Sequence, residues 1–519
     1  MPTISGIAGR LFMRLCFDRS RSLAHRLVRY RPMPRIACRP PGARRAAPFL
    51  AATLVAAIAC TGGRAREVPP SSVPETPPTG ATGSIAERPD IVLVLTDDQR
   101  WDELVGMPSI QRLLVAHGTN FTNAFTTDPL CCPSRASILT GTYPHTTGVY
   151  RNNGRHGGWT AFRERAEAST IATWLQNGGY HTAMFGKYFN GYRTTEIPPG
   201  WDRIIALTSP GPGYVDYAVN DDGTEVQYGT GPADYATDVF ARGAVDFIRT
   251  TPEDQPLFVY FAPSAPHLPA LPAPRYETAD VGTPIRSPAV NETDVSDKPA
   301  HIRALGQLAQ GVLDGVAVRR ARSLLAVDDA VADMIGALRR SGRLGRTLFV
   351  FASDNGVAIG EHRWRYKLTP YEESIRIPLV VRYDAVDAPP SIDLLALNID
   401  LAPTFADVAG ITPSSPVEGT SLLPLLRGRS DGWRRDFLIE NLVIRRGNDE
   451  PVVPTYCGIR TARWKLVHYD TGELELYDLT ADPYELENLA HGSGRDGVIE
   501  RLDARLRKLC DPPPPGFSF

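Results

Sequence analysis

Short, continuous apolar runs recur along the chain between residues 89 and 382. Runs of this length without polar alternation are typical of strands buried on both faces of a parallel sheet. They occupy residues 91–95, 181–185, 257–262, 348–352 and 378–382. Residues 234–249 and 319–340, which lie between them, carry apolar side chains at helical spacing. This alternation predicts an α/β fold with a large mixed, mostly parallel sheet sandwiched by helices.

The pattern changes near residue 430, where the apolar runs become shorter and alternate with polar residues. Strands are predicted at 437–442, 458–461, 465–469 and 473–477, and a final helix at 497–509. The sequence Asp470-Thr471-Gly472 is a hairpin signal between two of these strands. We therefore expect an α/β domain at 89–429 and a smaller C-terminal α+β subdomain at 430–519, with an antiparallel sheet plus a helix.

The first 60 residues are typical of an export signal. A basic segment leads into an apolar run, Ala46 to Ala59, which is too short to cross a bilayer comfortably. The sequence Ala57-Ile58-Ala59-Cys60 resembles a bacterial lipobox, which would make Cys60 a lipidated membrane anchor. Residues 61–88 are a low-complexity linker. We expect an exported, extracytoplasmic protein, secreted or lipid-anchored; the alternative is a tail that is simply disordered.

Charge and cysteine content narrow the classes of function. A net charge of -2 gives a nucleic-acid partner no electrostatic support. Of the seven cysteines, three fall in the predicted leader and two are adjacent at 131–132. The remaining Cys457 and Cys510 could form a disulfide in an exported protein, or remain two unpaired thiols.

Acidic residues follow two of the predicted strands. Asp97 and Asp98 come after the first run, and Asp354 and Asn355 come after the run at 348–352. Ligands of open α/β sheets bind at the carboxyl ends of strands, so these side chains are expected to meet there. Three carboxylates and an amide oxygen are a hard donor set that suits Ca²⁺ or Mg²⁺. Taken alone, an Asp-Asn-Gly after a strand could equally be a turn.

Residues 131–141 read Cys-Cys-Pro-Ser-Arg-Ala-Ser-Ile-Leu-Thr-Gly. This run resembles the signature of the sulfatase family, part of the alkaline phosphatase superfamily, and the resemblance extends over roughly 89–510. It implies that Cys131 is converted to Cα-formylglycine (3-oxoalanine) by a formylglycine-generating enzyme, with Cys132 at the variable position. It also implies one bound divalent ion, with the modified residue 131 completing a ligand set of Asp97, Asp98, Asp354 and Asn355. Otherwise Cys131 and Cys132 are ordinary buried cysteines.

The same resemblance assigns chemical roles to residues beyond the metal ligands. In the family the hydrated aldehyde at the position of Cys131 attacks sulfur, and the sulfo-enzyme hemiester that forms then collapses and expels sulfate. Arg135 would support the hydrated aldehyde. Lys187 and Lys367 match the two sulfate-contacting lysines, where fixed positive charge stabilises the transition state. His267 matches the histidine near the leaving oxygen, the expected general acid.

One position departs from the common pattern. Many sulfatases continue Gly-Lys-(Trp/Tyr)-His, but Phe189 stands where this histidine would be. Asn190 and His145 are candidates to replace its contact. The sequence Gly-Lys-Tyr-Phe-Asn at 186–190 resembles the N-acetylglucosamine-6-sulfatase branch and the related heparan endosulfatases. Within the loop 361–365, His362 and Arg363 are candidates to bind an anionic sugar, although a basic surface loop is an equal interpretation.

These observations predict an enzyme that hydrolyses O-sulfate esters of sulfated carbohydrates, such as N-acetylglucosamine 6-sulfate. Two alternatives remain open at this point. One is a phosphonate or phosphate ester hydrolase of the same superfamily. The other is a surface lipoprotein that binds sulfated glycans without turnover.

Overall fold

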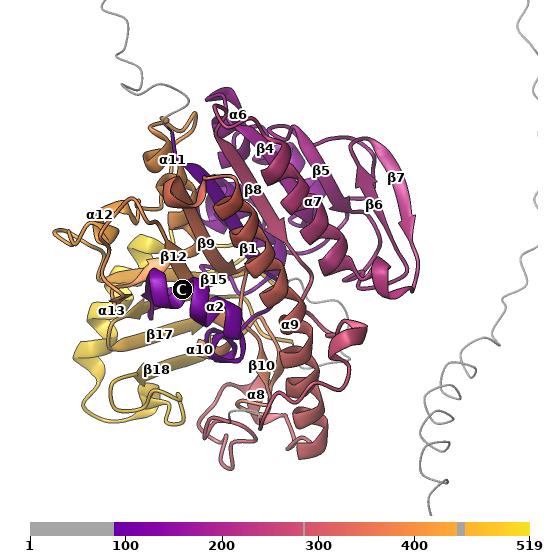
Figure 1. The fold of residues 1–519 in the computed structure, drawn as a ribbon. Coiled ribbons are helices and arrows are strands. Elements are labelled where there is room, and N and C mark those ends of the chain that lie inside the picture. Colours follow the sequence, from indigo (N-terminus) through magenta and orange to yellow (C-terminus); the bar gives the residue numbers. More distant parts are fainter. Residues whose placement is uncertain (1–87, 284–285, 444–451) are drawn as a thin grey trace, which may run out of the picture. The chain divides into compact units, whose positions relative to one another are not determined.

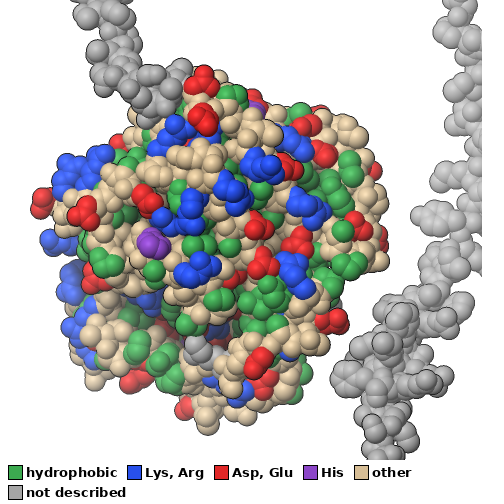
Figure 2. Space-filling model, viewed as in Figure 1, with side chains coloured by type: hydrophobic (Ala, Val, Ile, Leu, Met, Phe, Trp, Pro, Cys, Tyr) green, Lys and Arg blue, Asp and Glu red, His purple; other side chains and the backbone are tan. Residues whose placement is uncertain are grey.

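The computed structural model describes residues 88–283, 286–443 and 452–519 (Figure 1). The predicted leader at 1–60, with Cys60, and the predicted linker up to residue 87 lie outside the described residues. Among the described helices, none is both long and apolar enough to cross a membrane. Figure 2 shows positive and negative side chains interspersed over one face of the protein, in keeping with its near-neutral net charge.

A ten-stranded sheet forms the centre of the protein, in the order β13-β2-β12-β9-β1-β8-β4-β5-β6-β7. Strands β9, β1, β8, β4 and β5 are parallel, whereas β12 pairs antiparallel with β9 and the hairpin β6–β7 completes one edge. The five predicted apolar runs are β1 (Asp90–Thr96), β4 (His181–Gly186), β8 (Leu257–Ala262), β9 (Thr347–Ser353) and β12 (Leu379–Arg382). The predicted mixed, mostly parallel sheet is therefore confirmed.

The shorter strands extend this sheet at both edges. They are β2 (Thr119–Phe121), β5 (Arg203–Leu207), β6 (Tyr217–Asp221), β7 (Thr224–Tyr228) and β13 (Ser391–Ile392).

Strand β1 shows why these runs are apolar at every position. Ile91, Leu93 and Leu95 belong to the core on one face of the sheet, and Val92 and Val94 belong to the core on the other. Successive side chains of a strand point to opposite faces, so a strand covered on both sides needs apolar residues throughout.

Helices cover both faces of the sheet. Helices α7 (Ala236–Thr250) and α9 (Gln310–Arg340) pack side by side on one face (Figure 1). The opposite core includes α3 (Cys131–Thr140), α6 (Ile171–Asn177) and α11 (Leu401–Ala409). Helix α9 begins at Gln310, nine residues before the predicted start at 319, and Leu313 is the one buried side chain of that extension.

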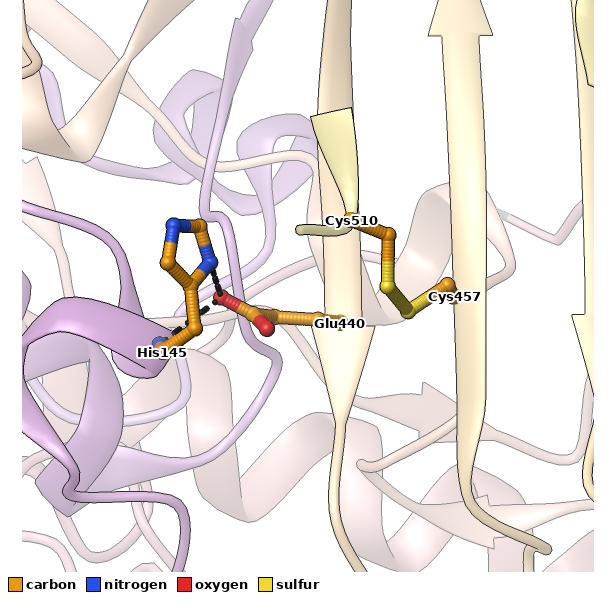
Figure 3. The surroundings of a disulfide bond; sticks show 4 residues. All are labelled: His145, Glu440, Cys457 and Cys510. Atoms are coloured by element: carbon orange, nitrogen blue, oxygen red, sulfur yellow. Dashed lines mark hydrogen bonds and ion pairs between the residues drawn. A yellow bond between two sulfur atoms is a disulfide. The ribbon is translucent and has the colours of Figure 1, made fainter. Parts of the chain in front are cut away.

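The C-terminal part forms a four-stranded antiparallel sheet in the order β15-β16-β17-β18, as predicted. One face shares an apolar core with the main part of the protein, and helix α13 (Asp496–Leu509) packs on the other. A disulfide joins Cys457 to Cys510 and so ties the end of α13 to β16 (Figure 3). The strands are β15 (Asp436–Asn441), β16 (Tyr456–Thr461), β17 (Trp464–Tyr469) and β18 (Leu474–Asp478).

Candidate active site

The carboxyl ends of four neighbouring strands bring the predicted polar residues to one edge of the central sheet. Asp97 directly follows β1, Asp354 follows β9, and Lys187 follows β4. His267 lies five residues beyond the end of β8. Because β9, β1, β8 and β4 are adjacent in the sheet, residues up to 257 positions apart in sequence become neighbours.

The acidic residues form one buried cluster. Carboxylate oxygens of Asp97, Asp98 and Asp354 all lie within 4.8 Å of one another. Asp98 has a φ of 68°, a conformation that aspartate tolerates better than most residues. Its backbone N–H donates to Asp354 Oδ1 at 3.0 Å, and Asn355 Nδ2 donates to Asp98 Oδ1 at 2.7 Å. The cluster is thus built by contacts between the ends of β1 and β9.

The donor atoms of this cluster fit a hard divalent cation. Asn355 Oδ1 is buried and has no hydrogen-bond partner among the described residues. Leaving such an oxygen without a partner costs about 1–3 kcal/mol, which a bound cation would offset. Three carboxylates and this amide oxygen form an all-oxygen set of the kind that Ca²⁺ or Mg²⁺ prefers.

Two lysines face the carboxylates. Lys187 Nζ lies 2.5 Å from Asp97 Oδ2, and Lys367 Nζ lies 2.5 Å from Asp98 Oδ1 and 2.8 Å from the sulfur of Cys131. Although burial acts in the opposite direction, Lys187 lowers the pKa of Asp97 and Lys367 lowers that of Asp98. Both acids are therefore ionised at neutral pH, and both lysines carry their charge beside Cys131.

Cys131 is the first residue of helix α3, which lies entirely in the protein interior. Its thiol is fully buried and donates to Asp97 Oδ1 at 3.4 Å. Burial and the Asp97 charge raise the pKa of the Cys131 thiol well above its usual range. An unmodified thiol at this position is therefore neutral and a weak nucleophile.

Arg135 lies one turn further along α3, on the same side of the helix. Its Nε donates to Asp354 Oδ2 at 2.9 Å, and one terminal nitrogen donates to the carbonyl oxygen of Lys187 at 2.9 Å. Arg135 thus connects the residues that follow β9 and β4 and orients both of them.

His267 faces the cluster with one ring nitrogen. Its Nδ1 lies 2.7 Å from the carbonyl oxygen of Leu268, so Nδ1 carries the hydrogen. This leaves Nε2 toward the site, 3.7 Å from Asp98 Oδ2. One ligand atom each of His267, Asp97 and Cys131 lie within 4.8 Å of one another, so the imidazole can exchange a proton with a group bound beside residue 131.

Arg320 of α9 is a positioning residue that sequence patterns did not identify. It is buried and makes two contacts of 2.6 and 2.7 Å with the carboxylate of Glu103. It also donates to the carbonyl oxygens of Asp98 at 2.7 Å and Pro266 at 3.2 Å, and so fixes the backbone beside Asp98 and His267. In the sequence it belongs to a run of arginines that looks like a solvated helix face; only its burial reveals the role.

Three candidate substrate residues do not line the cavity beside the carboxylate cluster; they contact other parts of the protein. His145 Nδ1 lies 2.8 Å from a carboxylate oxygen of Glu440, which belongs to strand β15 of the C-terminal sheet (Figure 3). Its Nε2 lies 3.5 Å from a carboxylate oxygen of Glu418. His362 is fully buried, with Nδ1 2.7 Å from a carboxylate oxygen of Glu292.

Arg363 is the third of these residues. It donates to the carbonyl oxygens of Glu292, Thr293 and Leu305. Because these contacts engage its guanidinium, Arg363 stabilises the packing of the loop that carries it against residues 292–305.

Asn190, in contrast, lines a cavity of about 230 Å³ beside the carboxylate cluster. Its side-chain oxygen accepts from Cys132 Sγ at 3.5 Å, which places the amide next to the start of α3. Asp97, Lys187 and His267 line the same cavity, so a small substrate placed there would meet the catalytic candidates.

Comparison with known proteins agrees with this geometry. Residues 89–411 match the sulfatase family model, and residues 360–511 match the C-terminal model of N-sulphoglucosamine sulphohydrolase. Human N-acetylglucosamine-6-sulfatase is 32% identical over 492 residues, covering 83% of this chain and 88% of that protein. An extracellular sulfatase homolog of Drosophila melanogaster is 34% identical over 371 residues, which are 68% of this chain but only 33% of that longer protein.

Solved structures share the fold at lower identity. A structure in complex with its substrate D-glucosamine-2-N,6-O-disulfate has a TM-score of 0.67 and 24% identity, covering 83% of this chain and 100% of that one. The phosphonate monoester hydrolase of Agrobacterium radiobacter has a TM-score of 0.65 and 20% identity, covering 82% and 96%. The family match covers most of the described fold, and on these grounds the chain belongs to the sulfatase family, the hydrolases of sulfuric esters.

Proposed function

We propose that this protein is a formylglycine-dependent sulfatase that removes O-sulfate groups from sulfated sugars such as N-acetylglucosamine 6-sulfate. The observation that carries the proposal is the position of Cys131. It starts a buried helix at the point where the carboxylate cluster, Lys367 and His267 converge. A formylglycine-generating enzyme would convert Cys131 during maturation.

Each neighbouring residue has a defined task in this proposal. A divalent ion bound by Asp97, Asp98, Asp354 and Asn355 would supply positive charge that makes a bound hydroxyl more acidic. Formylglycine at position 131 would supply a hydroxyl of its hydrated aldehyde as the nucleophile. The unmodified thiol of Cys131 is neutral and would be a weaker nucleophile. Lys187 and Lys367 would hold the sulfuryl oxygens, and their fixed charges would stabilise the transition state.

Two residues complete the arrangement. Arg135 would keep Asp354 and the backbone of Lys187 in position through its contacts of 2.9 Å. In its doubly protonated form, His267 would donate the Nε2 proton to the leaving alcohol and become a neutral imidazole, while its Nδ1–H stays bonded to the carbonyl oxygen of Leu268.

The sequence and the related proteins support both the proposed sugar substrate and the proposed location outside the cytoplasm. The Gly-Lys-Tyr-Phe-Asn run at 186–190 and the human relative both favour an N-acetylglucosamine 6-sulfate substrate. The basic and apolar pattern of residues 1–60 and the extracellular relative favour export, with Cys60 as a lipid anchor. We further propose that residues 89–429 form the catalytic domain and that residues 430–519 form a smaller subdomain.

Phosphonate ester hydrolysis is the second candidate, favoured by the fold shared with the Agrobacterium enzyme. The two activities are separated by kcat/KM for an aryl sulfate and for an aryl phosphonate monoester. A sulfate preference of at least about tenfold, roughly 1.4 kcal/mol, is expected. A preference for the phosphonate would overturn the proposed function.

Mass analysis of the peptide that contains residue 131 tests the modification directly. Conversion of cysteine to formylglycine lowers the mass by about 18 Da, and the aldehyde should react with a hydrazide. Cys131→Ala should abolish turnover, whereas Cys132→Ala, its neighbour in the same helix, should retain it. Equal loss in both variants would contradict the assignment of residue 131.

A further inference from the structure

One wall of the active-site cavity carries a positive charge that the proposed reaction does not use. Arg193 lines the cavity six residues beyond Lys187. Its side chain is exposed and makes no hydrogen bond or ion pair with any residue that the structure describes. Lys187, the other permanently charged cation of the lining, is already held by Asp97 at 2.5 Å. Arg193 therefore remains available to a ligand.

The backbone that carries Arg193 is held rigidly. The preceding residue, Tyr192, is buried, and its hydroxyl donates to the carbonyl oxygen of Glu196 at 2.5 Å. The same hydroxyl accepts from Asn220 Nδ2 at 2.7 Å, and the ring packs edge-on against Trp159. Because the backbone is already ordered, binding at Arg193 requires ordering only of its own side chain and not of the loop.

The remaining lining of the cavity combines neutral polar side chains with apolar ones such as Phe189 and Leu207. Among the described residues that line the cavity, Asp97 is the only carboxylate, and it lies at the catalytic end. Asn153, Asn190 and Ser209 line the same cavity as Arg193. Amide and hydroxyl groups of this kind suit sugar hydroxyls, whereas a planar guanidinium suits a sulfate or carboxylate through paired N–H donors.

We propose that Arg193 forms a subsite for a second anionic group on the sugar substrate, apart from the sulfate that is hydrolysed. The inference rests on the proposed function and adds a substrate class to it: sugars with two negative groups, either a second sulfate or the carboxylate of an adjoining uronic acid. Both a sulfate and a carboxylate accept paired hydrogen bonds from a guanidinium, so Arg193 could bind either group. The interaction is electrostatic and partly exposed to solvent, so it weakens as salt concentration rises.

The experiment compares kcat/KM for three sugars: N-acetylglucosamine 6-sulfate, glucosamine 2-N,6-O-disulfate, and a disaccharide that joins 6-sulfated N-acetylglucosamine to a uronic acid. The wild-type protein should prefer at least one doubly charged sugar by about tenfold, and the preference should shrink in 0.5 M salt. Which sugar is preferred distinguishes a sulfate from a carboxylate as the second group. Arg193→Ala should reduce the ratio to about one, and Arg193→Lys should give an intermediate ratio because the paired donors are lost.

Arg249→Ala is the matched control, since Arg249 is an exposed arginine on α7 that does not line the cavity; it should keep the wild-type ratio. Titration of the same sugars into Cys131→Ala protein measures affinity without turnover. A ratio that Arg193→Ala leaves unchanged, in turnover and in affinity, would overturn the subsite. Wild-type protein that turns over none of the three sugars would contradict the proposed function instead, and the affinity ratio would still decide the subsite.

Discussion

Asp354 lies at the centre of the charge network and has no exposed surface. One carboxylate oxygen accepts from Arg135 Nε at 2.9 Å, and the other accepts from the backbone N–H groups of Asp98 and Asn355. Asp354→Asn should remove the bound divalent ion and turnover together, because it takes a charge from the ligand set. It should also destabilise the fold by about 3 kcal/mol, since the buried Arg135 would lose its nearest carboxylate charge, 2.9 Å from Nε. Metal analysis and thermal unfolding measure both effects; retained ion and retained turnover would count against the metal site.

His267 offers a second prediction at this scale, based on its free Nε2. His267→Ala should slow the hydrolysis of sugar sulfates, which are esters of poorly acidic alcohols, by about 10²–10⁴-fold. Activated aryl sulfates should lose much less, because their leaving groups need no proton. Plotting log(kcat/KM) against the pKa of the leaving alcohol should therefore give a steeper slope for the variant. An equal loss for all esters would contradict the role of general acid.

At the scale of elements, the end of strand β4 has to be glycine. Gly186 has a φ of 115°, and a Cβ atom there would lie 2.1 Å from the carbonyl oxygen of Ala262 on β8. Gly186→Ala would break the pairing of β4 with β8 just before Lys187, so it should destabilise the fold by more than about 3 kcal/mol. Gly472→Ala is the control: its φ of 81° is also positive, but its Cβ would meet nothing within 4 Å.

The control should cost only about 1–2 kcal/mol, the ordinary penalty of the left-handed region. Thermal unfolding of the two variants measures the difference. If both variants lost the same stability, the close approach of the two strands would not be the reason for Gly186.

At the scale of the whole molecule, His145 connects the main part of the protein to the C-terminal sheet. Although burial lowers it, hydrogen bonds to Glu418 and Glu440 raise the pKa of His145 to about 10. The two acids respond differently: contact with His145 lowers the pKa of Glu418 against the effect of burial, whereas burial raises that of Glu440. His145 gains its proton more readily in the folded state. Its stabilising contribution is therefore complete below its unfolded pKa of about 6.5 and is lost as the pH rises toward 10.

Comparing wild-type protein with His145→Gln tests this pH dependence. The variant should be less stable by about 1–3 kcal/mol at pH 6, and the difference should disappear near pH 10. Denaturant unfolding across this range measures it. A difference that stays constant with pH would show that the imidazole contributes by packing alone.

The secondary elements and the central chemistry could be predicted locally. Continuous apolar runs such as Ile91–Leu95 reveal a strand covered on both faces, because each side chain must meet a core. The start of α9 and the helix α3 were harder to predict from the sequence. Every residue of α3 is buried, so Cys131 to Thr140 lack the contrast between a polar, solvent-exposed face and an apolar, buried face that marks a surface helix.

The sequence by itself determined the family, the polar residues that end β1, β4 and β9, and the motif around Cys131, because each depends on neighbouring residues. Only the tertiary structure decided which of them meet and which charges remain free. It placed His362 in the interior, paired His145 with Glu440 and buried Arg320 behind Asp98. It also left Arg193 without a hydrogen-bond or ion-pair partner among the residues that the structure describes. Those outcomes depend on residues tens to hundreds of positions away, brought close by strand order and packing, and no local pattern encodes that proximity.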